Sequence, residues 1–285
     1  MNFYKIAGLN LAVDGVEFEY FNSRMKNYEV DFFNNADISV KFQYDNSIDL
    51  KMPDAFVTRN GRSYYETKNE IGFYDYIDEV DRYVSFMKTN KKWSDFSYTY
   101  SDLTDLFGIA PDLTVVNVLG HLFEQGLRHF DGAVLHASTI MYNGKAVTFT
   151  APSGTGKSTH TGLWKKYYPE TVIINDDMPA IRKVDGTYRA FGTPWAGKTH
   201  INENVSAPLY AMVFIERAEE CSITEMVPME AVIRMMREIP ISVYKGQSDL
   251  LLDFYNDLFK TVPAYLLKCN ISRDAVEVVK DKLML

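Results

Sequence analysis

The chain has 285 residues, of which 46 % are hydrophobic and 24 % charged, an ordinary composition for a folded globular protein. A net charge of −8 argues against a general nucleic-acid binder, which would present a basic face. Two cysteines do not make a disulfide framework, and no window reaches the roughly 20 apolar residues of a membrane helix. Residues 1–15 lack the apolar core of a signal peptide, so we expect a cytoplasmic protein with neither nucleic-acid nor membrane partners.

Residues 1–110 are predicted to form a β-rich N-terminal region. Short runs of β-branched and aromatic residues, such as FYKIAGL, YEVDFF and DISVKFQY, are separated by Asp, Asn and Gly. The pairs Asn60-Gly61 and Asp14-Gly15 predict hairpin turns, because both pairs tolerate a positive φ. Residues 83–100 are expected to add two more strands. No catalytic motif lies here, so we interpret the region as an accessory antiparallel sheet.

A helix is predicted over residues 112–130, at the start of a second region that spans residues 111–285. Its apolar residues recur at spacings of three and four, which is the stripe of an amphipathic helix. They are Val115, Val118, Leu119, Leu122, Phe123, Leu127 and Phe130.

The rest of the second region alternates between strand and helix patterns, which predicts an α/β fold with mixed sheets. Hairpin turns are expected at Asn143-Gly144 and Asp185-Gly186. Strands are predicted over 133–142, 145–150, 170–177, 209–217 and 262–269. Helices are predicted over 158–166, from Pro228, after Ser248 and after Ser272, with the two serines as N-caps.

A glycine-rich loop, APSGTGKST at residues 151–159, matches the P-loop pattern with alanine in the first glycine position. Its glycines let successive backbone N–H groups turn toward phosphate oxygens, and the following helix adds the positive end of its dipole. Lys157 would reach the terminal phosphates, and the Ser158 hydroxyl would ligate Mg²⁺. The residues expected around the phosphates are Ser153, Gly154, Thr155, Gly156, Lys157, Ser158 and Thr159.

Two adjacent aspartates, Asp176 and Asp177, close the strand that follows this loop and helix. They lie 19 and 20 residues after Lys157, which fits a short helix, a turn and a strand that returns beside the loop. Chemistry on a nucleoside triphosphate needs a carboxylate near the metal ion. One aspartate would hold Mg²⁺ and the other would accept the proton of an attacking hydroxyl, with the assignment left open.

The segment from Leu135 to Arg182, with its SGTGKS loop and its IINDD strand end, resembles the catalytic core of HPr kinase/phosphorylase. It is also similar to the P-loop of phosphoenolpyruvate carboxykinase, and the likeness extends over about residues 130–220. The GTPWAGK run at residues 192–198 resembles HPr-kinase-like proteins of bacterial biosynthetic clusters. The resemblance implies a P-loop kinase core behind the β-rich region, with Mg²⁺-dependent transfer from ATP or another nucleotide to a hydroxyl. It puts Ser153 through Ser158 around the phosphates, assigns metal binding or base catalysis to Asp176 and Asp177, and places His136 near the reacting phosphate. We take as catalytic candidates Asp176, Asp177, Lys157 and His136, and as candidate metal ligands Ser158 and Asp177.

Several alternatives stay open. The acceptor could be a serine of a protein or peptide, as in the HPr kinases, or the hydroxyl of a small metabolite. A nucleotide-binding or hydrolysing module that acts through a partner, and a carboxykinase-like lyase, are the rival classes. The irregular loop over residues 192–204 could contribute Lys198 to a phosphate or acidic acceptor, and Trp195 could stack on a base or simply pack. The oligomeric state is not predicted.

Overall fold

The computed structural model describes the whole chain except residues 103–107, 109, 198 and 238–241. The chain divides into two compact units, Met1–His129 and Phe130–Leu285. This division leaves the helix after residue 110 in the N-terminal unit, whereas the sequence pattern groups it with the second region. Within the described ranges, no helix is both long and apolar enough to cross a membrane.

The N-terminal unit is built on an eight-stranded sheet in the order β1-β2-β3-β8-β7-β6-β5-β4. The pairs β2–β3 and β3–β8 are parallel and the others are antiparallel, so the sheet is mixed rather than antiparallel as expected. The strands are β1 (Asn2–Ile6), β2 (Leu9–Asp14), β3 (Ile38–Tyr44), β4 (Val57–Arg59), β5 (Arg62–Glu66), β6 (Glu70–Ile77), β7 (Arg82–Asn90) and β8 (Asp95–Tyr100).

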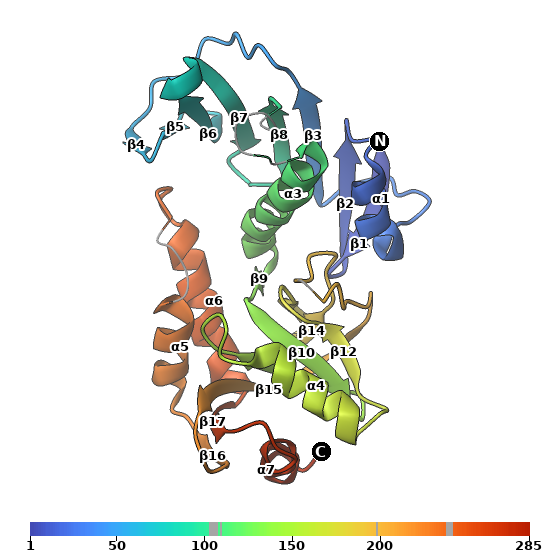
Figure 1. Cartoon of the computed structure of the whole chain (residues 1–285). Helices are drawn as coiled ribbons and strands as arrows, with labels where there is room; N and C mark the ends of the chain where they lie inside the picture. Colours follow the sequence, from blue (N-terminus) through green and yellow to red (C-terminus); the bar gives the residue numbers. More distant parts are fainter. Residues whose placement is uncertain (103–107, 109, 198, 238–241) are drawn as a thin grey trace. The chain divides into compact units, whose positions relative to one another are not determined.

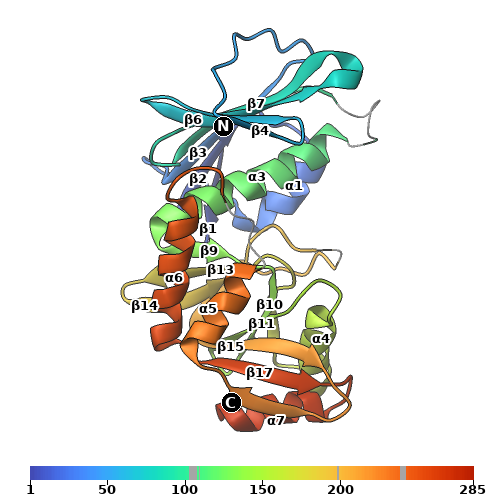
Figure 2. The same cartoon turned by 90° about the vertical axis from the view of Figure 1, so that its left-hand side faces the viewer.

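Two helices of the N-terminal unit, α1 (Glu19–Met25) and α3 (Pro111–Leu127), lie side by side on one face of this sheet (Figure 2). The predicted helix over 112–130 is thus confirmed as α3. It approaches the sheet closely at Gly126, where a Cβ atom would lie 2.9 Å from the Ile38 side chain. Short 3-10 turns are η1 (Lys26–Tyr28), η2 (Asp78–Val80) and η3 (Arg128–Phe130). The strand expected from YEVDFF is wrong: its first residue ends η1, and Glu29 forms only an isolated bridge with Tyr4.

One of the two predicted turns in this unit is correct. Asn60-Gly61, with φ of 52° and 76°, joins β4 to β5 as a hairpin. Asp14-Gly15 is not a hairpin, because the strand that follows, β3, pairs with β2 in parallel. Gly15 nevertheless has φ +77°, and a Cβ there would lie 2.0 Å from the Phe42 carbonyl oxygen. The hairpin between β1 and β2 is made instead by Ala7-Gly8, with φ of 51° and 78°.

The C-terminal unit contains a nine-stranded mixed sheet. Its main path is β12-β10-β11-β15-β14-β13-β9, and β17 pairs with β15 and with β16. The long β15 pairs with β14 near its start and with β17 from Met212 onward, so it belongs to both halves of the sheet. The strands are β9 (Gly132–Val134), β10 (Ala137–Tyr142), β11 (Lys145–Thr150), β12 (Val172–Asn175), β13 (Ala180–Val184), β14 (Thr187–Phe191), β15 (Ser206–Arg217), β16 (Ser222–Glu225) and β17 (Ala264–Cys269).

Helices cover both faces of this sheet (Figure 1). Alternate residues of β15 point to opposite faces, as in any strand. Val213 packs in a core with α4 and α7, and Phe214 packs in a second core with α5 and α6. Both faces of β15 are therefore apolar, which explains its unbroken hydrophobic run. The helices are α4 (Lys157–Tyr167), α5 (Pro228–Arg237), α6 (Gln247–Thr261) and α7 (Asp274–Leu283).

Most predicted elements of this unit are present, with three differences. The hairpins at Asn143-Gly144 and Asp185-Gly186 are confirmed by positive φ at all four residues. The strand expected over 133–142 is broken, since β9 ends at Val134 and β10 begins at Ala137. The two serine caps are wrong, because α6 begins after Gly246 and α7 after Arg273, neither with a side-chain cap. β16 was not predicted. The chain is a mixed α/β protein.

Candidate functional site

One edge of the C-terminal sheet collects the chemistry-bearing segments. Strand β10 lies between β11 and β12 and is antiparallel to both, so β11 and β12 point the same way. β15 is parallel to β11 and also ends at that edge. The edge therefore receives the loop after β11, the turn after β12, the end of β15 at Arg217, and His136 just before β10. The sheet topology brings together segments that are up to 81 positions apart (136 to 217).

The glycine-rich loop, residues 151–156, joins β11 to α4. Gly154 and Gly156 have φ of +77° and +122°, and a Cβ on Gly154 would meet nothing within 4 Å. Backbone conformation rather than crowding thus requires glycine at Gly154. The first N–H groups of α4 have no acceptor within the helix, and the helix dipole adds positive potential there. The loop and helix together favour an anion at this place.

Lys157, the first residue of α4, is only 8 % exposed. Its Nζ donates a hydrogen bond to the carbonyl oxygen of Ala151 at 2.9 Å, across the base of the glycine-rich loop. Ser158 and Thr159, the next two residues, are exposed, as are Ser153 and Gly154 in the loop. The structure thus brings an ammonium group and two exposed hydroxyls to the start of α4, where the P-loop pattern expects them.

Asn175, the last residue of β12, shapes the turn that carries the two aspartates. Its Oδ1 accepts hydrogen bonds from the backbone N–H of Asp177 at 2.9 Å and of Met178 at 2.7 Å. This is an Asx-type turn, placed directly after the strand. The Nδ2 of the same side chain donates to the carbonyl oxygen of Thr193 at 3.0 Å. One buried side chain therefore fixes both the aspartate turn and the start of the loop over 192–204.

Asp176 is 7 % exposed and both of its carboxylate oxygens are engaged. Oδ1 accepts from the Ser138 hydroxyl at 2.7 Å, and Oδ2 accepts from the Thr199 hydroxyl at 2.8 Å. The Ser138 Oγ also lies 2.9 Å from the Oγ1 of Thr161, in the second turn of α4. Asp176 is thereby connected through one side chain to the helix that begins at Lys157.

Asp177 lies in a more open position than its neighbour. Its side chain is 35 % exposed, and its Oδ1 lies 3.4 Å from the Nε2 of His136, which is itself exposed. A Cβ on Gly197 would lie 3.1 Å from Oδ2 of Asp177, so a residue without a side chain leaves that oxygen uncovered. The two aspartates therefore differ, one held in a hydroxyl network and the other open to a ligand.

The loop over residues 192–204 packs against the aspartate turn. Asn202 bridges to Asn175, and a Cβ on Gly192 would lie 1.9 Å from the carbonyl oxygen of Glu203. Trp195 is buried, so it packs rather than presenting a stacking surface, whereas His200 is exposed. Lys198, which the sequence suggests as a phosphate contact, lies outside the described residues.

His160, on α4, is buried and electrically neutral in the folded chain. Its Nε2 accepts a hydrogen bond from Trp164 Nε1 at 3.2 Å, and its ring centroid lies 4.5 Å from that of Phe149. Its Nδ1 finds no hydrogen-bond partner in the described part of the chain. Burial lowers the pKa of His160 to about 3, because the charged imidazolium cannot be solvated there.

Four side chains at this edge were not predicted as site residues. Ser138, Thr161 and Thr199 form the hydroxyl network around Asp176, and Arg217 donates hydrogen bonds to the loop carbonyl oxygens of Thr155, at 3.0 Å, and Gly154. No short local motif signals Ser138, Thr161 or Arg217, because their partners lie far away in sequence, whereas Thr199 lies in the candidate loop over residues 192–204.

The side chains at this edge offer a metal ion only a few oxygen ligands. Among the residues that the structure describes, no three His, Cys, Asp or Glu side chains are grouped as a metal site. Mg²⁺ in nucleotide sites takes only one or two protein ligands and completes its shell with phosphate oxygens and water. The exposed Ser158 and the half-exposed Asp177 fit that pattern, and they do not fit a metal ion bound by protein alone.

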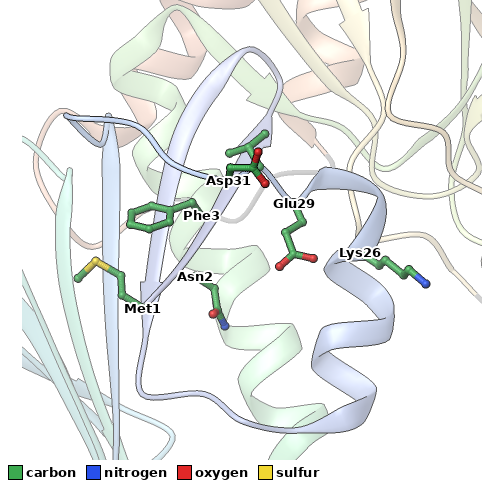
Figure 3. Close-up of a pocket in the computed structure, with 7 residues that line it drawn as sticks. Met1, Asn2, Phe3, Lys26, Glu29 and Asp31 are labelled. Carbon is green, nitrogen blue, oxygen red and sulfur yellow. The ribbon is translucent and has the colours of Figure 1, made fainter.

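Two pockets of about 520 Å³ each lie in different units. One is lined by residues 152–155 and 215–217, on the Arg217 side of the glycine-rich loop. The other, in the N-terminal unit, is lined by residues of β1 and of the segment after α1. Figure 3 shows Glu29 and Asn2 close together there, with Lys26 extending away from them. The first of these pockets adjoins the candidate site.

A comparison with protein families identifies the chain's relatives. The family described as "SynChlorMet cassette protein ScmC" matches residues 112–284, which is more than half of the chain. The chain belongs to this family. The match covers α3 and the whole edge described above. No curated protein matches this ScmC-family chain. Among solved structures, the Hpr(Ser) kinase/phosphatase from Coxiella burnetii is similar to it, with 10 % identity and a TM-score of 0.32, over 53 % of this chain and 96 % of that one. A likeness at this score carries no inference about activity.

Proposed function

We propose that this chain is a nucleotide-dependent kinase that transfers the γ-phosphoryl group of ATP, or of another nucleoside triphosphate, to a hydroxyl. One observation carries the proposal. The glycine-rich loop and the Asp176-Asp177 turn lie at the same sheet edge and are joined through Ser138 and Thr161. The N-terminus of a helix can bind any anion. Phosphoryl transfer also requires a carboxylate near the phosphates, and the aspartate turn supplies one.

The loop and the start of α4 would hold the phosphates. The loop N–H groups and the Lys157 ammonium supply positive charge, and to bind a phosphate Lys157 would exchange its contact with the Ala151 oxygen for a phosphate oxygen. The exposed Ser158 and Thr159 hydroxyls lie one and two residues further on. Ser158 and Asp177 would hold Mg²⁺, and the ion would offset the negative charge of the phosphates. Holding the nucleotide in one orientation would account for much of the rate.

The two aspartates would divide the remaining work. Both oxygens of Asp176 already accept hydroxyl hydrogen bonds, so we assign it to positioning. Asp177 is accessible, and we assign it the contacts with the metal ion and with the acceptor hydroxyl, whose proton it would accept. His136, 3.4 Å from Asp177 Oδ1, would orient that carboxylate. The acceptor is a serine of a protein or peptide, or alternatively a small alcohol.

The first experiment is a transfer assay with γ-labelled ATP, Mg²⁺ and an extract of the source organism, separated afterwards by size. Label in the large fraction identifies a protein or peptide kinase, and label in a small molecule identifies a metabolite kinase. Asp177→Asn should abolish the labelling, whereas Asp185→Asn, in the exposed turn between β13 and β14, should not. Lys157→Ala should weaken ATP binding as well as transfer.

Release of labelled phosphate alone, with ATP binding intact, would replace the kinase with a nucleotide-hydrolysing module. Full activity in both Lys157→Ala and Asp177→Asn would refute the assignment of the site.

A further inference from the structure

Arg217, the last residue of β15, contacts the glycine-rich loop from a distant part of the sequence. Its Nε donates to the carbonyl oxygen of Thr155 at 3.0 Å, and its Nη2 donates to the carbonyl oxygen of Gly154. The guanidinium fork is well suited to this geometry, because it presents fixed, nearly parallel donors to two neighbouring acceptors. A lysine carries its three N–H donors on one nitrogen atom and could not reproduce this fixed pair of donors.

The backbone that carries Arg217 is firmly held. β15 pairs in parallel with β11, where Thr150 lies opposite Phe214, and with β17, where Cys269 lies opposite Arg217. The preceding residue, Glu216, binds Arg234 of α5 at 2.8 Å. Arg217 therefore extends from a fixed sheet edge toward a loop that has no regular secondary structure.

The loop needs such support. Residues 152–154 are exposed, and the pocket of about 520 Å³ lies between the loop and the end of β15. Side-chain packing does not fill that space, and two glycines increase the number of conformations open to the backbone. Each ordered residue costs on the order of 1–2 kcal/mol of conformational entropy, so hydrogen bonds across the pocket matter for loop order.

The direction of the two carbonyl groups has a consequence for the N–H groups. In a trans peptide unit the C=O and the next N–H point in opposite directions. Holding the Thr155 carbonyl toward Arg217 turns the Gly156 N–H away from it. Holding the Gly154 carbonyl turns the Thr155 N–H away, where it donates to the Pro152 carbonyl oxygen at 3.2 Å and closes the turn.

We propose that Arg217 is a positioning residue that locks the glycine-rich loop in its ligand-receiving conformation before any ligand binds. It acts through the two loop carbonyls and not through contact with the reacting atoms. The effect of Arg217 on loop order does not depend on which ligand the loop binds. Its expected effect on ATP affinity rests on the proposed kinase function.

The test begins with amide hydrogen exchange of the ligand-free chain. Arg217→Ala should raise exchange of the Thr155 amide, which donates to the Pro152 carbonyl oxygen, about tenfold, the change that a loss of about 1.4 kcal/mol produces. Arg217→Lys should restore little of the protection. Arg189→Ala is the matched control, because Arg189 also donates to a carbonyl oxygen of β15, at Ser206 on the far end of that strand. It should leave the loop unchanged. Unaltered loop exchange in Arg217→Ala overturns the proposal.

The second measurement is the affinity for Mg-ATP at about 0.1 M and about 1 M salt, between which the screening length falls from about 10 Å to about 3 Å. Arg217→Ala and Arg217→Lys should both bind about tenfold more weakly at both salt concentrations. An effect that lysine rescues and high salt removes would mean that Arg217 acts only as a charge, and the proposal would be wrong. If Arg217→Ala exchanges faster in the loop but the unmodified chain binds no ATP, the positioning role of Arg217 holds and the proposed kinase function is refuted.

Discussion

Removal of the Ser138 hydroxyl tests the network that joins the two halves of the candidate site. Ser138 is fully buried, with its Oγ between Asp176 and Thr161. A serine has one hydroxyl proton and a carboxylate can only accept, so Ser138 donates to Asp176 and Thr161 donates to Ser138. In Ser138→Ala the carboxylate loses a donor in a buried site. Thr161 is compensated, because its hydroxyl can turn to the Ser158 carbonyl oxygen at 3.2 Å.

The two substitutions, Ser138→Ala and Thr161→Val, should differ in how much they lower the free energy of unfolding. A hydrogen bond to a charged group contributes about 1.5–3 kcal/mol, so we expect Ser138→Ala to lower the free energy of unfolding by about 2 kcal/mol. Thr161→Val leaves the bond from Ser138 to Asp176 in place, and should cost about 1 kcal/mol or less. At about 2–4 °C per kcal/mol for a unit of this size, Ser138→Ala should lower the Tm by about 4–8 °C.

The assay is urea unfolding followed by tryptophan fluorescence, with Thr139→Val as a control. Thr139, the next residue of β10, bonds to Thr148 at 2.9 Å and has no contact with the aspartates, so its loss should cost about 1 kcal/mol. The reasoning fails if Thr161→Val costs as much as Ser138→Ala, or if Ser138→Ala is no worse than Thr139→Val.

Three further predictions follow from the same geometry. The pKa of His160 is about 6.5 in the unfolded chain and about 3 in the folded chain, so between these pH values the unfolded chain binds one more proton. The free energy of unfolding should therefore fall as the pH drops from 6.5 toward 3, by up to about 1.4 kcal/mol per pH unit. His160→Gln should lack this component, and unfolding at pH 7 and pH 5 measures the difference, about 2 kcal/mol. Gly192→Ala should cost about 1–3 kcal/mol in thermal unfolding because its Cβ would meet the Glu203 oxygen, whereas Gly162→Ala, in open space on α4, should stabilise by about 0.4–1 kcal/mol. Under the proposed function, Asp177→Asn should lower the transfer rate by at least about a hundredfold and ATP affinity by much less, as steady-state kinetics and calorimetry will show.

Local sequence signals predicted those features whose cause is local. Asn143-Gly144 and Asp185-Gly186 form hairpins because a positive φ at two successive residues is nearly sufficient for that turn. Asp14-Gly15 has the same composition and Gly15 has the same φ, but its next strand pairs in parallel. The positive φ of Gly15 was predictable. The pairing of the next strand was not, because it depends on which strand of the sheet lies beside it.

The same distinction holds at the candidate site. The loop around Gly154 and the aspartate turn could be recognised because each occupies a few consecutive residues. The hydroxyl of Ser138 could not, because a buried serine carries no pattern, and Thr199 stood out only as part of the irregular loop over residues 192–204. The contacts of both hydroxyls with Asp176 span 38 and 23 positions. The separate roles proposed for Asp176 and Asp177 likewise depend on which carboxylate the fold covers.

The antiparallel insertion of β10 between β11 and β12 also bears on how the chain folds. It allows His136, the glycine-rich loop and both aspartates to come from one run of residues, 136–177, through the β10–β11 hairpin and the pairing of β10 with β12, where Thr139 lies opposite Asn175. Contacts between residues near in sequence form early, because little chain entropy is lost in closing them. The β10–β11 hairpin around Asn143-Gly144 can therefore form first, with the pairing of β10 to β12 and the contacts of Thr199 and Arg217 added later. Substitutions in this hairpin, residues 137–150, should slow folding, whereas the loss of Arg217 should leave the folding rate nearly unchanged.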